Sequence, residues 1–268
     1  MTSLFQGILY GKVMKKGIIL SVLVFFLGAG LFAQSAEYSA HLAEGKLENL
    51  NELYPFIKVP GKDYCIGKTE VTQELYEKVM GENPSYYKGD TLPVEKVSWY
   101  DAIYFCNKLS LLTGRRPIYS VNGETDINKW NYIPHKGKSI NGSIHFNTNA
   151  NGFRLPTNEE WEYAAKGGES YKYSGSDNID DVAWSAHFSS GFGTHPVAEK
   201  TGNAYGLYDM SGNVWEWVWD SSSSNCHYLR GGSCYSFNDN KCEVSDLDYY
   251  NACEQYRDLG FRLLIISD

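Results

Sequence analysis

Hydrophobic and polar positions begin to alternate regularly near residue 56. Residues 57–72, IKVPGKDYCIGKTEVT, alternate on both sides of a glycine turn, and this period of two predicts a pair of strands. Apolar residues then recur at helical spacing after Thr72 and stop at Gly81, which predicts a short helix with a threonine cap. We therefore expect a strand pair and a helix to open the folded part of the chain.

Two later helices carry stronger start signals. Ser98 and Asp101 form an S-x-x-D capping box ahead of an apolar stripe that ends at Gly114. Thr157 and Glu160 form a second box of this kind, and its apolar stripe is again followed by glycines. Both segments are expected to be amphipathic helices that pack on a core.

The rest of the pattern is short and irregular. Residues 115–153 are rich in Asn and Gly and hold two candidate strands, PIYSV and SIHFN, and LIISD is expected to be the last strand. No internal repeat or low-complexity linker divides the chain. We predict one α+β domain over residues 56–268, with few helices, short twisted sheets and much irregular backbone, after a lead-in at residues 37–55.

Residues 1–36 have the order of an export signal. Met14 is followed by two lysines, by an apolar run at residues 17–32 and then by small residues. We expect Met14 to be the start and the protein to be exported, to the cell surface or into the periplasm or extracellular space. An uncleaved membrane anchor is the alternative. The first cysteine is Cys65, so a lipid at the cleavage site is not expected.

Charge and aromatic content indicate which classes of partner the protein can bind. A net charge of -8 without a long basic run argues against binding to a nucleic-acid backbone, which needs clustered Lys and Arg. Aromatic residues make up 15% of the chain, with 21 Tyr, and this indicates either loops packed by rings or a recognition surface.

Cysteines concentrate near the end of the chain. Of the six cysteines, four lie in the last fifth, at Cys226, Cys234, Cys242 and Cys253. They form no C-x-x-C pair and no Cys/His spacing typical of zinc sites. Disulfide bonds and buried free thiols both remain open for them.

Six sequence blocks carry a resemblance to a known family. The blocks are GKTEVTQELYEKVM, PVEKVSWYDAIYFCNKLS, GFRLPTNEEWEYAAKGG, NAYGLYDMSGNVWEWVWD, LRGGS and LGFRL. In order and spacing the chain resembles the formylglycine-generating enzyme family (the sulfatase-modifying factors), and the resemblance covers nearly everything after residue 56. It implies the C-type lectin fold in the form that this family has.

The resemblance does not extend to the family's catalytic positions. Its enzymes hold copper with two cysteines after the GGS block, and Ser236 and Lys241 stand at those positions here. Cu(I) needs thiolates in a preset arrangement, which Ser and Lys do not supply. We therefore expect no catalytic residue, no copper and no required cofactor.

The block YDMSGNVWEW resembles the family's calcium-binding loop. The matching positions are Asp209, Gly212, Val214 and Glu216, and a structural calcium ion takes such mixed oxygen ligands readily. The alternative is a turn in which Asn213 and Glu216 bond to backbone while the neighbouring tryptophans pack in the core.

The aperiodic stretch near the end fits a second resemblance. Variable proteins of diversity-generating retroelements share this fold, and their variable region lies between an RGGS and a GFR block, here within residues 226–262. Randomised adenines in AAC or AAT codons give Asn, Tyr, Asp, Ser, Phe and a few others, but never Lys, Glu or Gln. The residues assigned to the variable ligand-binding face on this basis are Tyr228, Tyr235, Ser236, Phe237, Asn238, Asp246, Asp248, Tyr249, Tyr250, Asn251, Tyr256 and Asp258.

These observations favour an exported, non-catalytic protein with a diversified ligand site. The expected partner is a protein or glycan on a host or microbial surface, with the protein itself a monomer. A lectin-like adhesin of fixed specificity is one alternative, and an oxidase of the formylglycine-generating type is another. Tyr and Phe in the segment offer large contact areas at a small entropic cost, as in antibody paratopes.

Overall fold

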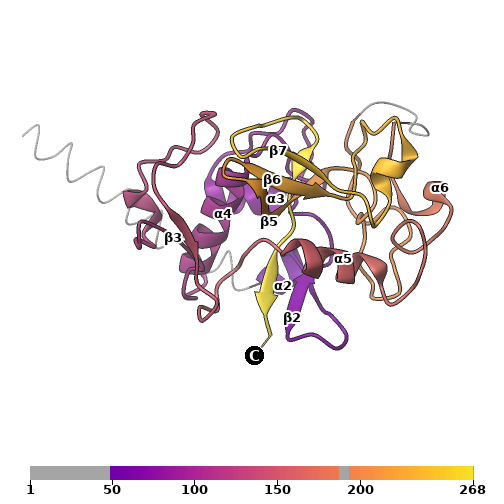
Figure 1. Cartoon of the computed structure of the whole chain (residues 1–268), viewed down its shortest axis with the longest axis horizontal. Coiled ribbons are helices and arrows are strands. Elements are labelled where there is room, and N and C mark those ends of the chain that lie inside the picture. The colour runs from indigo at the N-terminus through magenta and orange to yellow at the C-terminus, as the bar shows by residue number, and fades with distance from the viewer. Residues whose placement is uncertain (1–48, 187–192, 268) are drawn as a thin grey trace, which may run out of the picture. The chain divides into compact units, whose positions relative to one another are not determined.

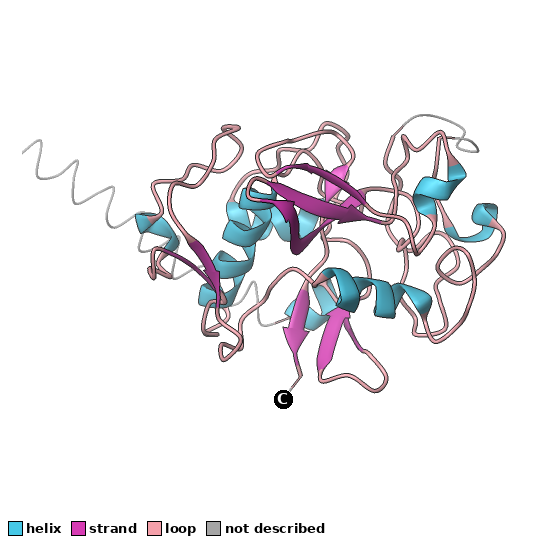
Figure 2. Cartoon of the chain, viewed as in Figure 1, coloured by secondary structure: helices cyan, strands magenta, loops and turns pink. Residues whose placement is uncertain are grey.

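The computed structural model describes residues 49–186 and 193–267. The predicted export signal lies outside these residues. Within them, no helix has the length and apolar character that crossing a bilayer needs. Helices are few and short relative to the loops (Figure 2), which agrees with the predicted α+β class. The α-helices are α2 (Leu50–Leu53), α3 (Gln73–Met80), α4 (Trp99–Leu112), α5 (Asn158–Lys166) and α6 (Ile179–Val182), and the 3-10 helices are η1 (Ile127–Lys129) and η2 (Asp239–Cys242).

The predicted helix starts are confirmed by their capping contacts. The Thr72 side chain accepts a hydrogen bond from the Leu75 amide at the start of α3. Ser98 and Thr157 each begin a complete capping box, in α4 and α5 respectively. These contacts satisfy amide groups that a helix start leaves without partners, so local sequence alone sets these boundaries.

The strands form three small sheets. Their order is β1-β2-β9 in the first sheet, β3-β4 in the second and β7-β6-β5-β8 in the third. The predicted strand pair at residues 57–72 and the predicted last strand are confirmed, and they lie together in the first sheet. The strands are β1 (Phe56–Lys58), β2 (Tyr64–Gly67), β3 (Tyr119–Val121), β4 (Ile144–Phe146), β5 (Trp215–Ser223), β6 (Cys226–Arg230), β7 (Asp248–Asn251), β8 (Leu259–Gly260) and β9 (Leu264–Ile266).

The third sheet carries most of the C-terminal segment, by which we mean residues 226–262. Strands β5, β6 and β7 run side by side in antiparallel pairs (Figure 1), while β8 pairs with β5 in parallel. Glu216 in β5 lies opposite Arg230 on one side and opposite Gly260 on the other. Both ends of the segment are therefore fixed to the same strand.

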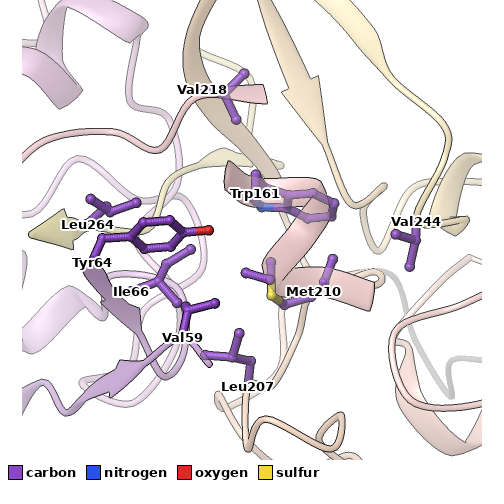
Figure 3. Close-up of a cluster of buried hydrophobic side chains, with 11 residues drawn as sticks. Val59, Tyr64, Ile66, Trp161, Leu207, Met210, Val218, Val244 and Leu264 are labelled. Atoms are coloured by element: carbon purple, nitrogen blue, oxygen red, sulfur yellow. The ribbon is translucent and has the colours of Figure 1, made fainter. Parts of the chain in front are cut away.

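A buried apolar cluster joins the helix α5 to two of the sheets. Trp161 of α5 packs with Tyr64 and Ile66 of β2, with Val218 of β5 and with Leu264 of β9 (Figure 3). All five side chains are at most 3% exposed. The core therefore draws on most of the length of the domain.

The compact unit begins at Asn49, before the predicted domain boundary at residue 56. Tyr54, which the sequence placed in the lead-in, is 1% exposed, and its hydroxyl donates to the Thr69 carbonyl at 2.8 Å. The reason is steric as well as polar, because the ring covers Gly67, where an added Cβ would lie 1.9 Å from the Tyr54 hydroxyl.

Candidate functional site

Glu216 and Arg262 form the centre of the scaffold beneath the C-terminal segment. Both side chains are fully buried, and Arg262 Nε donates to Glu216 Oε2 at 2.6 Å while Arg262 Nη2 lies 2.5 Å from Oε1. Trp161 donates its indole N–H to Oε2 at 2.7 Å. A buried ion pair with such additional bonds is costly to break, because either partner alone would be left as an uncompensated charge.

Arg230 anchors the other end of the segment. It is 1% exposed, and its Nη2 lies 2.9 Å from Glu162 Oε2 of α5. Its Nη1 donates to the carbonyls of Val244 and Asp246, at 3.1 and 2.9 Å. Arg230, the first residue of the RGGS block, therefore holds the backbone in the middle of the segment against α5.

The two glycines after Arg230 are needed where the chain turns. Gly231 and Gly232 have φ angles of 92° and 76°, a region that side-chain-bearing residues rarely adopt. A Cβ on Gly232 would lie 2.6 Å from the Cys242 thiol. The turn consequently brings the start of the segment against its middle.

The segment exposes large rings in the part that the sequence assigned to ligand binding. Of the ten large hydrophobic side chains that are exposed in the described residues, five lie between residues 237 and 256. Phe237 is 72% exposed, Tyr249 56%, Tyr256 47% and Tyr250 37%. The structure brings Tyr250 and Tyr256 together, edge to face, with 5.4 Å between ring centroids. These four side chains are called the exposed rings below.

Several predicted polar positions surround these rings. Asn238 and Asn251 are exposed. Asp246 and Asp248 are half-buried and flank Lys241, whose Nζ lies 3.4 and 3.3 Å from their carboxylates. Lys241, a residue outside the codon set, therefore ties two candidate variable residues to each other.

Of the predicted ligand-binding residues, Ser236 is buried and Asp258 is half-buried. Ser236 is 7% exposed, and its hydroxyl accepts from the Ser233 amide at 3.0 Å, so it closes a turn and its assignment to the surface is wrong. Asp258 accepts from the Ser233 hydroxyl at 2.7 Å, and burial raises the pKa of Asp258. Ser236 therefore acts within a local turn, which its residue type also suits, while Asp258 fixes that turn from a distant position in the sequence.

Two predicted tyrosines are half-buried and contact the scaffold. Tyr228 packs against the apolar cluster around Trp161. The Tyr235 hydroxyl contacts that of Tyr87 in a loop far away in sequence. Each of them presents only part of its ring to solvent.

Two residues of this surface were missed by the sequence reasoning. The Arg257 guanidinium lies 4.8 Å from the Tyr235 ring centroid and 5.6 Å from that of Tyr86, which is 61% exposed. Such contacts are cation–π interactions. Tyr86 lies outside the C-terminal segment, so no signal in that segment could have found it.

Gln255, predicted to be scaffold, has a partner in the core. Its amide donates to the buried Asp101 carboxylate at 2.9 Å, in the capping box of α4. Asp101 also accepts from Tyr132 and from the His135 amide, and hydrogen bonds together with His135 hold the pKa of Asp101 low despite its burial. The exposed rings are thus interrupted by a residue tied to the start of a helix.

The contacts of the predicted calcium loop do not fit the ligand set that the resemblance implies. Both oxygens of Glu216 are bonded to Arg262 and Trp161, and Asp209 accepts from the Ala198 amide at 2.7 Å. Asn213 bonds to the backbone of His195 in both directions, as the alternative reading predicts for it. No three His, Cys, Asp or Glu side chains among the described residues are placed to share a metal ion.

Carboxyl groups are nevertheless crowded around this loop. Burial raises the pKa of Asp209 to about 6, and burial together with the Asp209 and Glu216 charges raises that of Glu70 well above its usual range. Gly212 has a φ of 82° and lies against the backbone of Trp184. A Cβ added at Gly212 would lie 2.4 Å from the Trp184 carbonyl oxygen, so only glycine fits there. The loop is consequently buried and closely packed.

The positions of the family's copper ligands hold no thiol. Ser236 closes a turn and Lys241 pairs with two aspartates, as described above. Nearby Cys234 and Cys242 are buried free thiols, and burial raises the pKa of Cys242 to about 12 and that of Cys234 further. All six cysteines are free in the structure, and Cys226 and Cys253 are half-buried.

Comparison with known proteins places these features in context. Residues 24–266 match the family described as "Sulfatase-modifying factor enzyme 1-like domain". The chain is 36% identical over 245 residues to the "Chaperone protein LppX" of Paenibacillus barcinonensis, which covers 82% of this chain and 86% of that protein. It is 38% identical over 97 residues to the "Inactive C-alpha-formylglycine-generating enzyme 2" of Bos taurus, which covers 31% of this chain and 32% of that protein.

A solved structure shows the same fold. The "Treponema denticola variable protein 1" superposes with a TM-score of 0.70 and 38% identity, over 76% of this chain and 84% of that one. The predicted fold, and the predicted likeness to variable proteins with this form of the C-type lectin fold, are confirmed by these similarities.

Proposed function

Because the chain belongs to the family of the sulfatase-modifying factor enzyme 1-like domain and is similar to a variable protein, we propose that it is an exported, non-catalytic ligand-binding protein. Its ligand site consists of the exposed rings and the polar residues around them, and retroelement mutagenesis diversifies this site. The ligand is a protein or glycan on a host or microbial surface, and the protein acts as a monomer.

The exposure of the rings is the observation that carries this proposal. Large rings elsewhere in the described residues are mostly buried, whereas Phe237, Tyr249, Tyr250 and Tyr256 stand in solvent on a segment with anchored ends. Exposed aromatic side chains cost the folded chain solubility, so their concentration in one segment supports a role in contact with a partner. Tyr and Arg are also the residue types that dominate the energy of interfaces.

Fixed residues beside the rings support this assignment further. Arg257 lies against the rings of both Tyr235 and Tyr86, so a ligand that reaches the segment also meets Tyr86, a group from another loop. The buried anchors Arg230 and Arg262 hold the ends of the segment in place, which reduces the entropy that binding must remove.

The absence of catalysis is supported by the chemistry of the copper positions. Ser236 and Lys241 offer no thiolate, and the pKa values of Cys234 and Cys242 are raised, so their thiols keep their protons near neutral pH. The net charge of -8 makes nucleic acid an unsuitable partner.

Sequencing of the gene and its flanking DNA in many isolates tests the diversification. We expect substitutions confined to codons between Ser233 and Gly260, together with a nearby repeat that has adenines at the same sites. Within that interval we expect Lys241 and Gln255 to stay constant, because each is bonded to other parts of the structure. An unchanging segment without a repeat would contradict diversification.

A second candidate is a binding protein of fixed specificity. The similarity to a protein named as a chaperone, over 82% of this chain, favours it. In this case the segment is invariant between isolates, and one protein or glycan binds the wild-type chain but not a variant with Tyr250→Ser and Tyr256→Ser. The same double substitution at Tyr163 and Tyr171, which are exposed outside the segment, serves as the control.

A further inference from the structure

A groove of about 980 Å³ lies next to the third sheet. Four parts of the scaffold line it: the start of α4, the loop at residues 139–144, the first turn of α5 and the hairpin that joins β5 to β6. Of the residues predicted to be variable, Tyr228 alone is among those that line this groove. Apart from Tyr228, the groove is thus built from positions outside the predicted variable set.

Stacked aromatic side chains make one wall of the groove rigid. The rings of Trp99 and His227 stack with 3.7 Å between centroids, and Trp219 packs against Trp99 at 5.4 Å. Trp99 donates its indole N–H to the Val218 carbonyl, and the ring of His227 is bonded through Nδ1 to the Trp219 carbonyl at 2.9 Å. Trp99 is only 2% exposed and supports this wall from behind, so the preorganised surface that a ligand can reach consists of the half-buried rings of His227 and Trp219.

The imidazole of His227 is uncharged in this wall. Burial lowers the pKa of His227 to about 4. The wall therefore presents a neutral face across the physiological pH range.

The other lining groups are mostly neutral and polar. They include Ser139, Asn141, Ser221 and Asn225, all of which are exposed at the surface. Hydroxyl and amide side chains both donate and accept hydrogen bonds. Among the described residues that line the groove there is no Lys or Arg, so a phosphate or another anion lacks a counter-charge here.

Two carboxylates complete the lining. Asp220 accepts from the Asn158 amide at 2.6 Å and so is held against the start of α5, while Glu159 is exposed. Fixed carboxylates accept hydrogen bonds from hydroxyl groups, and they are few among the neutral groups of this groove.

We propose that this groove is a second ligand site, distinct from the exposed rings, and that it binds a neutral oligosaccharide. Such a ligand has apolar faces of C–H groups that stack on flat rings, and hydroxyl groups that pair with Ser, Asn and Asp. The volume lies within the range of small-ligand sites, which is about 300 to 1,000 Å³. Apart from Tyr228, the lining of the groove lies outside the predicted variable positions, so most of its chemistry is shared by copies whose C-terminal segments differ.

Calorimetric titration of the full chain with a panel of neutral oligosaccharides tests this proposal. The panel consists of linear oligomers of glucose, mannose, galactose, xylose and N-acetylglucosamine. We expect at least one of them to bind the wild-type protein. Ser221→Trp and Asn141→Trp fill the groove from two different elements, and each should weaken that binding about tenfold or more, which is at least 1.4 kcal/mol.

Matched controls separate the groove from its surroundings. Ser222→Trp adds the same ring at the next position of β5, which is not among the residues that line the groove, and it should leave binding unchanged. Phe237→Ala removes an exposed ring of the C-terminal segment and should also have no effect. This control distinguishes the groove from the proposed diversified site.

Three outcomes overturn the proposal. The first is that no member of the panel binds the wild-type protein. The second is that an oligosaccharide binds the wild-type protein, but Phe237→Ala abolishes this binding or both groove variants retain it. The third is that no oligosaccharide binds, whereas a basic peptide such as oligolysine binds and Ser221→Trp abolishes its binding. The groove would then select cations through Glu159 and Asp220.

Discussion

Two regions of this protein contain several aromatic residues and place them in opposite environments. Residues 208–220 contain Tyr208 and three tryptophans, and most of their side chains are buried. The C-terminal segment holds seven aromatic residues and exposes four of their rings to solvent. Aromatic content alone therefore does not tell whether a region is core or contact surface.

The difference lies in what the polar atoms of each region bond to. In the buried region Trp217 donates its indole N–H to the Val97 carbonyl, and Glu216 is paired with Arg262. Both contacts reach parts of the chain far away in sequence. A buried aromatic region requires such partners, because an unsatisfied polar atom in a core is costly, whereas an exposed ring can leave its hydroxyl to water.

The largest effect is expected from breaking the buried region at its ion pair. Arg262→Met leaves the Glu216 carboxylate buried without its counter-charge and should lower the free energy of unfolding by about 3 to 5 kcal/mol. Arg257→Met serves as the matched control at an exposed arginine and should change it by about 0.5 kcal/mol or less. Urea denaturation measures the free energy of unfolding of both variants. Equal losses of stability would mean that the buried ion pair contributes no more than an exposed arginine does.

A smaller effect is expected from pH. Burial raises the pKa of Glu95 from 4.5 to about 7, so the folded chain holds this proton more tightly than the unfolded chain. The resulting stabilisation is complete below pH 4.5 and is lost as the pH rises to 7, by about 1 to 3 kcal/mol. Glu95→Gln should remove this slope when unfolding is followed at several pH values between 4.5 and 7. A variant with the same slope as the wild type would contradict the assignment.

Substitution of the exposed rings should have still less effect on stability. Phe237→Ser and Tyr249→Ser each remove a ring that is more than half exposed, and each should change the free energy of unfolding by about 0.5 kcal/mol or less. Trp161→Ala, in the apolar cluster, is the contrast and should cost about 3 to 5 kcal/mol. A large loss with Phe237→Ser would show that this ring packs in the fold and does not serve contact.

The smallest effect is expected from removing calcium. Because both Glu216 oxygens bond to Arg262 and Trp161, a chelator should leave the melting temperature unchanged. Calorimetric scans with calcium and with a chelator measure this. A rise in melting temperature with calcium would support the calcium loop that the family resemblance implies, and would require Glu216 to leave its partners.

Local features of the fold could be predicted from the sequence because they depend on neighbouring residues. The capping boxes at Ser98 and Thr157 and the alternation at residues 57–72 are signals of this kind. The pairing of β8 with β5 could not be derived in this way, because it joins residues that are distant in sequence and follows no local period.

The sequence predicted which residue types make up the candidate site, but not which of these residues are buried. A codon set indicates which residue types occur, and it cannot tell that Ser236 turns inward to the Ser233 amide. It is also silent about Tyr86, which reaches the segment from another loop. Burial and contacts between distant loops depend on the whole fold, so neither follows from the pattern of the segment.

Arg230 and Gly260 pair with Glu216 from opposite sides, on the neighbouring strands β6 and β8. The chain between Arg230 and Gly260 is therefore a closed loop. Because neighbouring strands lie about 4.8 Å apart, its two ends are held about 10 Å from each other whatever lies between them. The entropy of closing such a loop depends only weakly on length, at about 0.6 kcal/mol for each doubling. Insertions at its exposed turns should therefore leave the fold intact, so that this scaffold can carry loops of different lengths as well as of different sequences.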